Sequence, residues 1–126
     1  MRDAARNADR KRANKGAQPN ERMIRLIILL GPKVGISEPQ FFEHWQKVHK
    51  ALVEQLPGIR RYRQSRAHEA GMPFGSHRAA VAELWFDSVE ALQVAWRSPQ
   101  EHAARTDAET FIDVNSLSMT VVSEVA

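Results

Sequence analysis

Residues 37–56, SEPQFFEHWQKVHKALVEQL, carry the pattern around which the other elements of the chain are arranged. At about 100° per residue, seven apolar side chains fall within about 140° of one helix face: Phe41, Phe42, Trp45, Val48, Leu52, Val53 and Leu56. Ser37 and Gln40 have the spacing of a capping box, and Pro39 suits a first turn. Pro57 and Gly58 end the pattern. The stretch therefore predicts one amphipathic helix.

Two histidines make this helix the candidate location for chemistry. His49 lies in the middle of the apolar arc, and an imidazole with an ordinary pKa near 6.5 is suited to moving a proton at neutral pH. The alternative is a core histidine that is hydrogen-bonded to a backbone carbonyl or a carboxylate, and periodicity alone favours it. His44 is about 140° away on a regular helix. We therefore expect it to support the fold or a subunit contact, and not to share a metal ion with His49.

Four segments around this helix have the composition of strands. Residues 23–30 are apolar on both faces apart from Arg25, and residues 58–68 carry four arginines, which indicates a sheet edge or the wall of a polar cavity. Residues 79–87 are apolar around Glu83, and residues 116–125 alternate. Asp87 with Glu90 predicts the cap of a second helix. Ser98 and Thr106 each begin a further capping pattern, which predicts two short helical pieces.

The element order is β-α-β-β-α-β, the split βαβ or ferredoxin-like plan of the α+β class. It predicts one four-stranded antiparallel sheet with helices on one face. The other face would remain open although it carries apolar side chains, and such a surface needs a cover. The same face of a second copy is the simplest cover, which would give a homodimeric α+β barrel.

Composition restricts the class of protein. The chain has 126 residues and no cysteine, which suits one domain and excludes disulfides and thiolate chemistry. Residues 1–22 carry seven Lys or Arg against three acidic residues and almost no large apolar residue, so we expect a disordered basic leader before a domain at 23–126. The remainder is nearly neutral, which argues against nucleic-acid binding. There is no apolar run of membrane-spanning length and no secretory signal, so we expect a cytoplasmic protein.

Several segments together resemble the EthD family, a group of dimeric α+β barrel proteins: MIRLIILL, FFEHWQKVHKALVEQLPGIRRYRQ, VAELWFDSVEALQVAWRSPQ and the closing FID. The resemblance covers residues 23–126. It implies the ferredoxin-like fold and a histidine at position 49 that faces a pocket between helix and sheet. The family is similar to fungal polyketide dehydratases and decarboxylases and to lactone methylisomerases, and the wider superfamily includes cofactor-free quinol monooxygenases. Fold carries over across such a group, whereas reaction does not.

The leading hypothesis is a small enzyme of catabolism or polyketide-type metabolism that acts as an isomerase, dehydratase or lyase. His49 would move a proton on a compact cyclic carbonyl compound, and Glu83 would orient His49 or else face water at an edge. Tyr62 would hold a substrate oxygen or pack its ring, and Arg61 would attract a carboxylate or an enolate or lie on a solvated strand face. Trp45 and Trp85 are candidates for the pocket wall and, alternatively, for the core.

No nucleotide-binding loop, zinc-protease motif or nucleophile elbow is present, so we expect neither a cofactor nor a metal ion. Two alternatives stay open. One is cofactor-free oxygenation of a quinol-type substrate, and the other is a non-catalytic protein that binds a ligand for an oxidation system.

Overall fold

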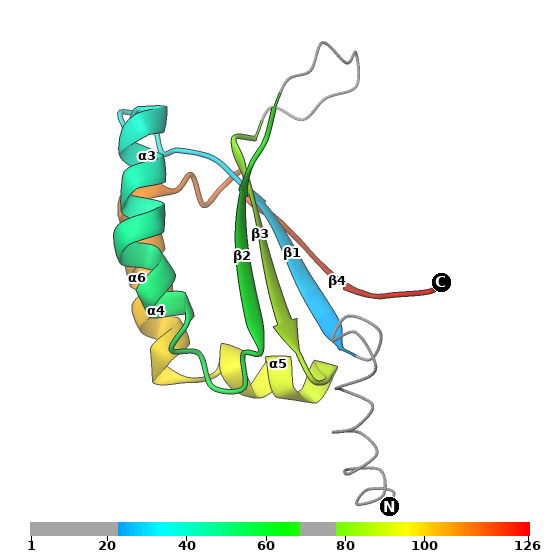
Figure 1. Cartoon of the computed structure of the whole chain (residues 1–126). Coiled ribbons are helices and arrows are strands. Elements are labelled where there is room, and N and C mark those ends of the chain that lie inside the picture. The colour runs from blue at the N-terminus through cyan, green and yellow to red at the C-terminus, as the bar shows by residue number, and fades with distance from the viewer. Residues whose placement is uncertain (1–22, 69–77) are drawn as a thin grey trace, which may run out of the picture.

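The computed structural model of the protein describes residues 23–68 and 78–126 (Figure 1). The expected leader of residues 1–22 and the expected loop of residues 69–77 lie outside this part of the chain. The described residues follow the predicted order β-α-β-β-α-β.

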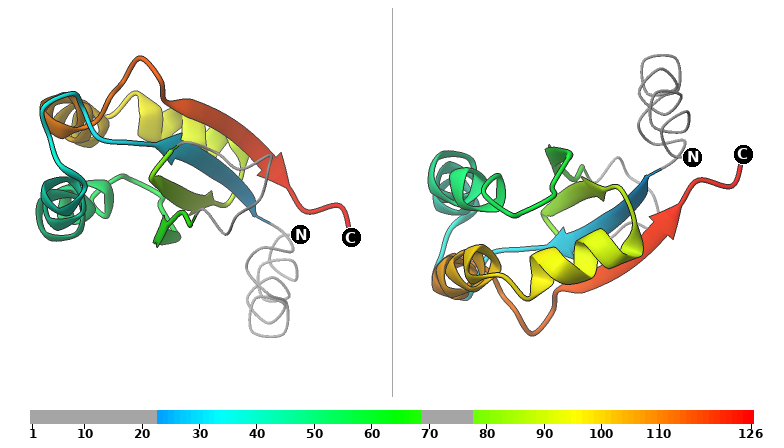
Figure 2. Two further views of the ribbon diagram at one scale, coloured as in Figure 1. Left: turned by 90° about the horizontal axis from the view of Figure 1, so that it is seen from above. Right: turned by 90° about the horizontal axis from the view of Figure 1, so that it is seen from below.

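The strands are β1 (Ile24–Leu30), β2 (Arg61–Arg66), β3 (Ala80–Phe86) and β4 (Ser118–Ser123). They form one antiparallel sheet in the order β2-β3-β1-β4, with β3 and β1 at its centre. The helices gather on one side of this sheet in the end-on views (Figure 2). The ferredoxin-like prediction is thus confirmed, although β2 and β4 are shorter than the segments 58–68 and 116–125 that the sequence suggested.

The strand register assigns the central side chains to two faces. Leu26 pairs with Leu84, and both are buried beneath the helices. Ile27, one residue later on β1, pairs with Glu83, one residue earlier on β3, so these two lie on the opposite face because side chains alternate. Ile27 is only partly buried. The sheet therefore has a helix-covered face and an open face.

Helices α3 (Glu38–His44), η1 (Trp45–His49) and α4 (Lys50–Val53) continue into one another as a single helical element. Its predicted start is confirmed: the Gln40 N–H donates to Ser37 Oγ at 3.2 Å, and the Ser37 N–H donates to Gln40 Oε1 at 2.9 Å. The regular helix ends at Val53, ahead of the predicted end at residue 56. Gly58, at φ 79°, then turns the chain towards β2.

Two further helices, α5 (Val89–Trp96) and α6 (Pro99–Phe111), complete this layer. Ser88 caps α5 by accepting from the Ala91 N–H at 3.1 Å, so the prediction that Asp87 is the cap is wrong by one residue. Ser98 caps α6 as predicted. The expected second start at Thr106 is wrong because its hydroxyl donates to the His102 carbonyl inside one continuous helix.

The core lies where this helical layer meets the sheet. Phe41 and Phe86 are fully buried, and Trp45 is nearly so. The Phe41 ring lies 5.6 Å from that of Trp45 and 5.5 Å from that of Phe111 on α6, so aromatic contacts join the two long helical elements. In the part of the chain that the structure describes, no helix combines the length and the hydropathy that a membrane crossing requires.

Candidate active site

The helical element that carries both histidines contains one wide turn, η1. The Lys50 N–H donates to the Trp45 carbonyl five residues back, whereas an α-helix pairs residues four apart. A turn of this width brings residues five apart to the same side. His44 and His49 therefore point the same way, and the predicted separation of about 140° is wrong because it assumed α-helical geometry throughout. The turn also leaves Val48 44% exposed, outside the apolar side on which it was expected.

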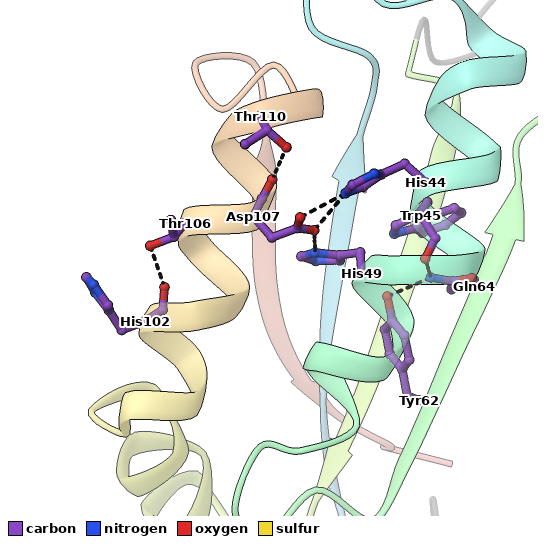
Figure 3. A network of polar contacts seen from close by, with 9 residues as sticks. All are labelled: His44, Trp45, His49, Tyr62, Gln64, His102, Thr106, Asp107 and Thr110. Carbon is purple, nitrogen blue, oxygen red and sulfur yellow. Dashed lines mark hydrogen bonds and ion pairs between the residues drawn. The ribbon is translucent and has the colours of Figure 1, made fainter.

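Both imidazoles contact one carboxylate, that of Asp107 in α6 (Figure 3). His44 Nε2 lies 2.8 Å from Asp107 Oδ1 and 3.1 Å from Oδ2. His49 Nδ1 lies 2.9 Å from the same Oδ2. An ionised carboxylate only accepts hydrogen bonds, so each ring presents an N–H to it. This arrangement fixes the proton of neutral His49 on Nδ1 and leaves the Nε2 lone pair free to act as a base.

The two histidines differ in their access to solvent. The His49 side chain is 10% exposed and that of His44 is 33% exposed. Burial lowers the pKa of His49 below its ordinary value of 6.5, while the hydrogen bond and the charge of Asp107 act in the opposite direction. At neutral pH His49 is therefore uncharged and able to take up a proton. No described residue hydrogen-bonds to its Nε2.

A second set of contacts extends from the wide turn to strand β2. Gln64 Nε2 donates to the Trp45 carbonyl at 2.9 Å and to the Tyr62 hydroxyl oxygen at 3.1 Å. Burial raises the pKa of Tyr62 to about 12. The phenol therefore stays protonated and keeps an O–H that can donate to a ligand. The turn thus positions His49 on one side and, through Gln64, Tyr62 on the other (Figure 3).

His49 and Tyr62 open onto a common pocket of about 280 Å³ between the sheet and the helices. Apolar side chains make up most of its wall, among them Trp45 and Leu84. On the α6 side the residues at 104 and 108 are alanines, whose small side chains leave space next to the histidine. The pocket can hold a compact ligand whose polar atoms meet His49 and Tyr62.

Three of the predicted site residues, His49, Tyr62 and Trp45, meet at this pocket. The other three, Glu83, Arg61 and Trp85, lie across the sheet on the open face. The expected pairing of Glu83 with His49 is wrong, because Glu83 binds Arg25 Nη1 at 3.1 Å.

Arg61 lies with its guanidinium 5.0 Å from the centre of the Trp85 ring. Neither residue lines the pocket, so the expected contact of Arg61 and Trp85 with a pocket ligand is wrong as well. The reason is strand alternation, since both follow the odd-numbered positions of β2 and β3 that face away from the helices.

Asp107 is, with Gln64, a site residue that the sequence did not suggest. The capping patterns at Ser98 and Thr106 predict two short pieces in the segment 98–112, and this division does not indicate that Asp107 lies on a longer helix. On one continuous helix, Asp107 is three residues from Ala104 and four from Phe111, both buried. A carboxylate next to the buried side of a helix is the signal that would have identified it.

Within residues 23–68 and 78–126 there is no group of three or more His, Cys, Asp or Glu side chains suited to holding a metal ion. The contact of His44 and His49 with Asp107 is a hydrogen-bonded arrangement of two rings and one carboxylate.

Comparisons with known proteins support the fold described above. The model of the EthD domain matches residues 33–115. An EthD family protein from Bacillus halodurans, known from a crystal structure, is 29% identical with a TM-score of 0.67, and the match covers 82% of this chain and 99% of that one. An uncharacterized 11.0 kDa protein from the thcB–thcC intergenic region of Rhodococcus erythropolis is 31% identical over 56% of this chain and 68% of its own length.

Two more distant structures share the fold alone. SnoaB, a cofactor-independent oxygenase from Streptomyces nogalater, is 13% identical with a TM-score of 0.61, over 82% of this chain and 94% of that one. A dimeric ferredoxin-like protein from Thermobifida fusca is 14% identical with a TM-score of 0.63, over 81% and 92%.

Proposed function

Because this chain belongs to the EthD family, we propose that it is a small enzyme in which His49 moves a proton on a compact cyclic carbonyl compound, without a metal ion or an organic cofactor. One observation carries the proposal: a buried histidine, backed by a carboxylate at Nδ1, lines an apolar pocket. A base is most effective when its pKa lies near the working pH and when it is held in one tautomer.

Proton removal would begin at His49 Nε2. The ring takes the proton from a carbon next to the substrate carbonyl, and the resulting imidazolium is stabilised by Asp107. A hydrogen bond to a charged group contributes about 1.5–3 kcal/mol. The Tyr62 hydroxyl donates to the carbonyl oxygen, where negative charge develops. Return of the proton to another carbon gives isomerisation, whereas its transfer from the imidazolium to a neighbouring hydroxyl, which leaves as water, gives dehydration.

The size and lining of the pocket support the substrate class. A volume of about 280 Å³ suits a molecule of one or two small rings. The apolar part of the wall favours a largely hydrocarbon surface, and His49 and Tyr62 favour a carbonyl next to an acidic C–H. Three charged residues of α6, Glu101, Arg105 and Glu109, also line the pocket.

Deuterium exchange tests the proposal directly. The purified protein would be incubated in D₂O with a panel of compact cyclic ketones and unsaturated lactones, and NMR would follow deuterium uptake next to the carbonyl. We expect His49→Ala to slow the exchange by about 10²-fold or more, with His102→Ala, an exposed histidine on α6, as the control. Full exchange by His49→Ala would refute the role of His49.

A second candidate is cofactor-free oxygenation of a quinol-type compound, which starts from the same proton removal. The fold shared with SnoaB favours it, as does a base in an apolar pocket where a deprotonated substrate meets oxygen away from water. Oxygen uptake with a hydroquinone panel distinguishes this reaction from isomerisation. A binding protein without chemistry would instead take up apolar ligands while both assays stay silent.

We also propose that two copies associate through the open sheet face. Ile27, Leu29 and Val81 lie half-buried there, and a protein of the same fold from Thermobifida fusca is dimeric. Sedimentation of the purified protein at micromolar concentration tests this, with Val81→Glu expected to give monomers. Val94→Glu on the exposed side of α5 is the control, and a monomeric wild-type protein would contradict the proposal.

A further inference from the structure

His44 lies between the pocket site and the protein surface. Its side chain is 33% exposed, whereas that of Asp107 is 15% and that of His49 is 10% exposed. It lines a shallow surface hollow together with Glu43 and Lys47. The three groups His44, Asp107 and His49 therefore form a continuous hydrogen-bonded path from solvent to the pocket (Figure 3).

The contacts of His44 fix the carboxylate that His49 uses. His44 Nε2 lies within 3.1 Å of both Asp107 oxygens, and His49 Nδ1 contacts only one of them, Oδ2. Rotation of the carboxylate towards solvent would break both contacts. The His44 ring is itself held by Phe111, with 4.4 Å between ring centres. The more exposed ring thus restrains the acceptor of the buried one.

We propose that His44 is a positioning residue, which holds the Asp107 carboxylate against His49 and couples its own protonation to the proton affinity of the pocket. The inference rests on the proposed function in that it assigns His49 as the base. It concerns regulation of that site, because His44, which solvent can reach, would change the proton affinity of His49, which is buried.

The coupling follows from the shared oxygen. Oδ2 lies 2.9 Å from His49 Nδ1 and 3.1 Å from His44 Nε2, so the two rings are within about 6 Å of each other. Burial lowers the pKa of His49, Asp107 raises it, and a positive charge on His44 lowers it again. Glu43 and Lys47 line the same hollow as His44, where they pair with each other at 3.4 Å and are largely exposed. Because Glu43 and Lys47 pair with each other, the charge of His44 is the one that acts specifically on the pKa of His49, through Asp107.

An NMR titration tests the inference without any substrate. Long-range proton–nitrogen spectra of the full chain with labelled histidine give the tautomer and the titration curve of each ring. His44→Gln keeps an N–H near the carboxylate but carries no charge, so we expect the midpoint of His49 to rise by about half a pH unit, as for unit charges about 6 Å apart in a water-like medium. The His49 proton should stay on Nδ1.

A second variant separates positioning from charge. His44→Phe keeps a ring beside Phe111 but removes the donor, so His49 should lose its single tautomer and show a mixture of both. His102→Gln is the matched control and should leave His49 unchanged. An identical tautomer and midpoint of His49 in wild type, His44→Gln and His44→Phe would overturn the inference. Since no turnover is measured, this result is independent of whether the proposed proton transfer takes place.

Discussion

Asp107→Asn is the substitution that bears most directly on the site, and its effect on stability follows from the contacts. The wild-type carboxylate accepts from His44 and from His49, and its side chain is 15% exposed. Each hydrogen bond to a charged group contributes about 1.5–3 kcal/mol, whereas a neutral one contributes about 0.5–1.5 kcal/mol. Asparagine keeps one neutral acceptor but turns its amide N–H groups towards the other ring. We therefore expect the free energy of unfolding to fall by about 2 kcal/mol.

Urea denaturation at pH 7 measures this change. For a protein of this size a slope of about 1–3 kcal/mol per molar urea converts the loss into a midpoint lowered by about 1 M. Asp87→Asn is the matched control, since Asp87 forms one exposed ion pair with Arg60 at 3.3 Å. Exposed pairs contribute about 0–1 kcal/mol. Equal effects of the two substitutions would refute the view that Asp107 organises the histidines.

Three other predictions concern the same site. Because the folded pKa of His49 lies below its ordinary value of 6.5, its contribution to stability is complete above about pH 6.5 and is lost as pH falls; urea midpoints between pH 5 and 8 should show this loss, and His49→Gln should reduce it. Ala104→Leu should fill the pocket and abolish binding of a compact ketone, measured by Trp fluorescence, whereas Ala103→Leu on the exposed side of α6 should not. Tyr62→Phe should leave the fold intact and slow deuterium exchange by about 10²-fold, and an unchanged rate would exclude the hydroxyl from the reaction.

Much of the fold was predictable because it depends on local rules. Alternation in residues 23–30 placed Leu26 and Leu30 on one face, and both are buried beneath the helices. Ser37 and Ser98 marked two helix starts, since each serine hydroxyl oxygen accepts from the otherwise unpaired backbone N–H three residues later. Such signals need only a few neighbouring residues and are read correctly without the rest of the chain.

The arrangement of the site was less predictable, because it depends on a departure from regular geometry and on a distant partner. A constant rotation of about 100° per residue predicts Val48 on the apolar face and His44 away from His49. The wide turn instead leaves Val48 exposed and brings His44 to the same side as His49. Asp107 is 58 residues from His49, and no local pattern relates them. Glu83 seemed a partner for His49 because it stands in an apolar strand, yet the alternation of β3 directs it to the open face.

The wide turn η1, which is a π-helical turn, also has a consequence for comparing relatives. It contains one residue more than an α-helix needs to cover the same path. A relative with its two histidines four residues apart would place both rings on one side with regular geometry. Alignment of such a sequence with this one should therefore require a single-residue gap inside the helix, between the histidines, with both flanking turns in register. The spacing of the two histidines would then report, from sequence alone, which family members have inserted this extra residue.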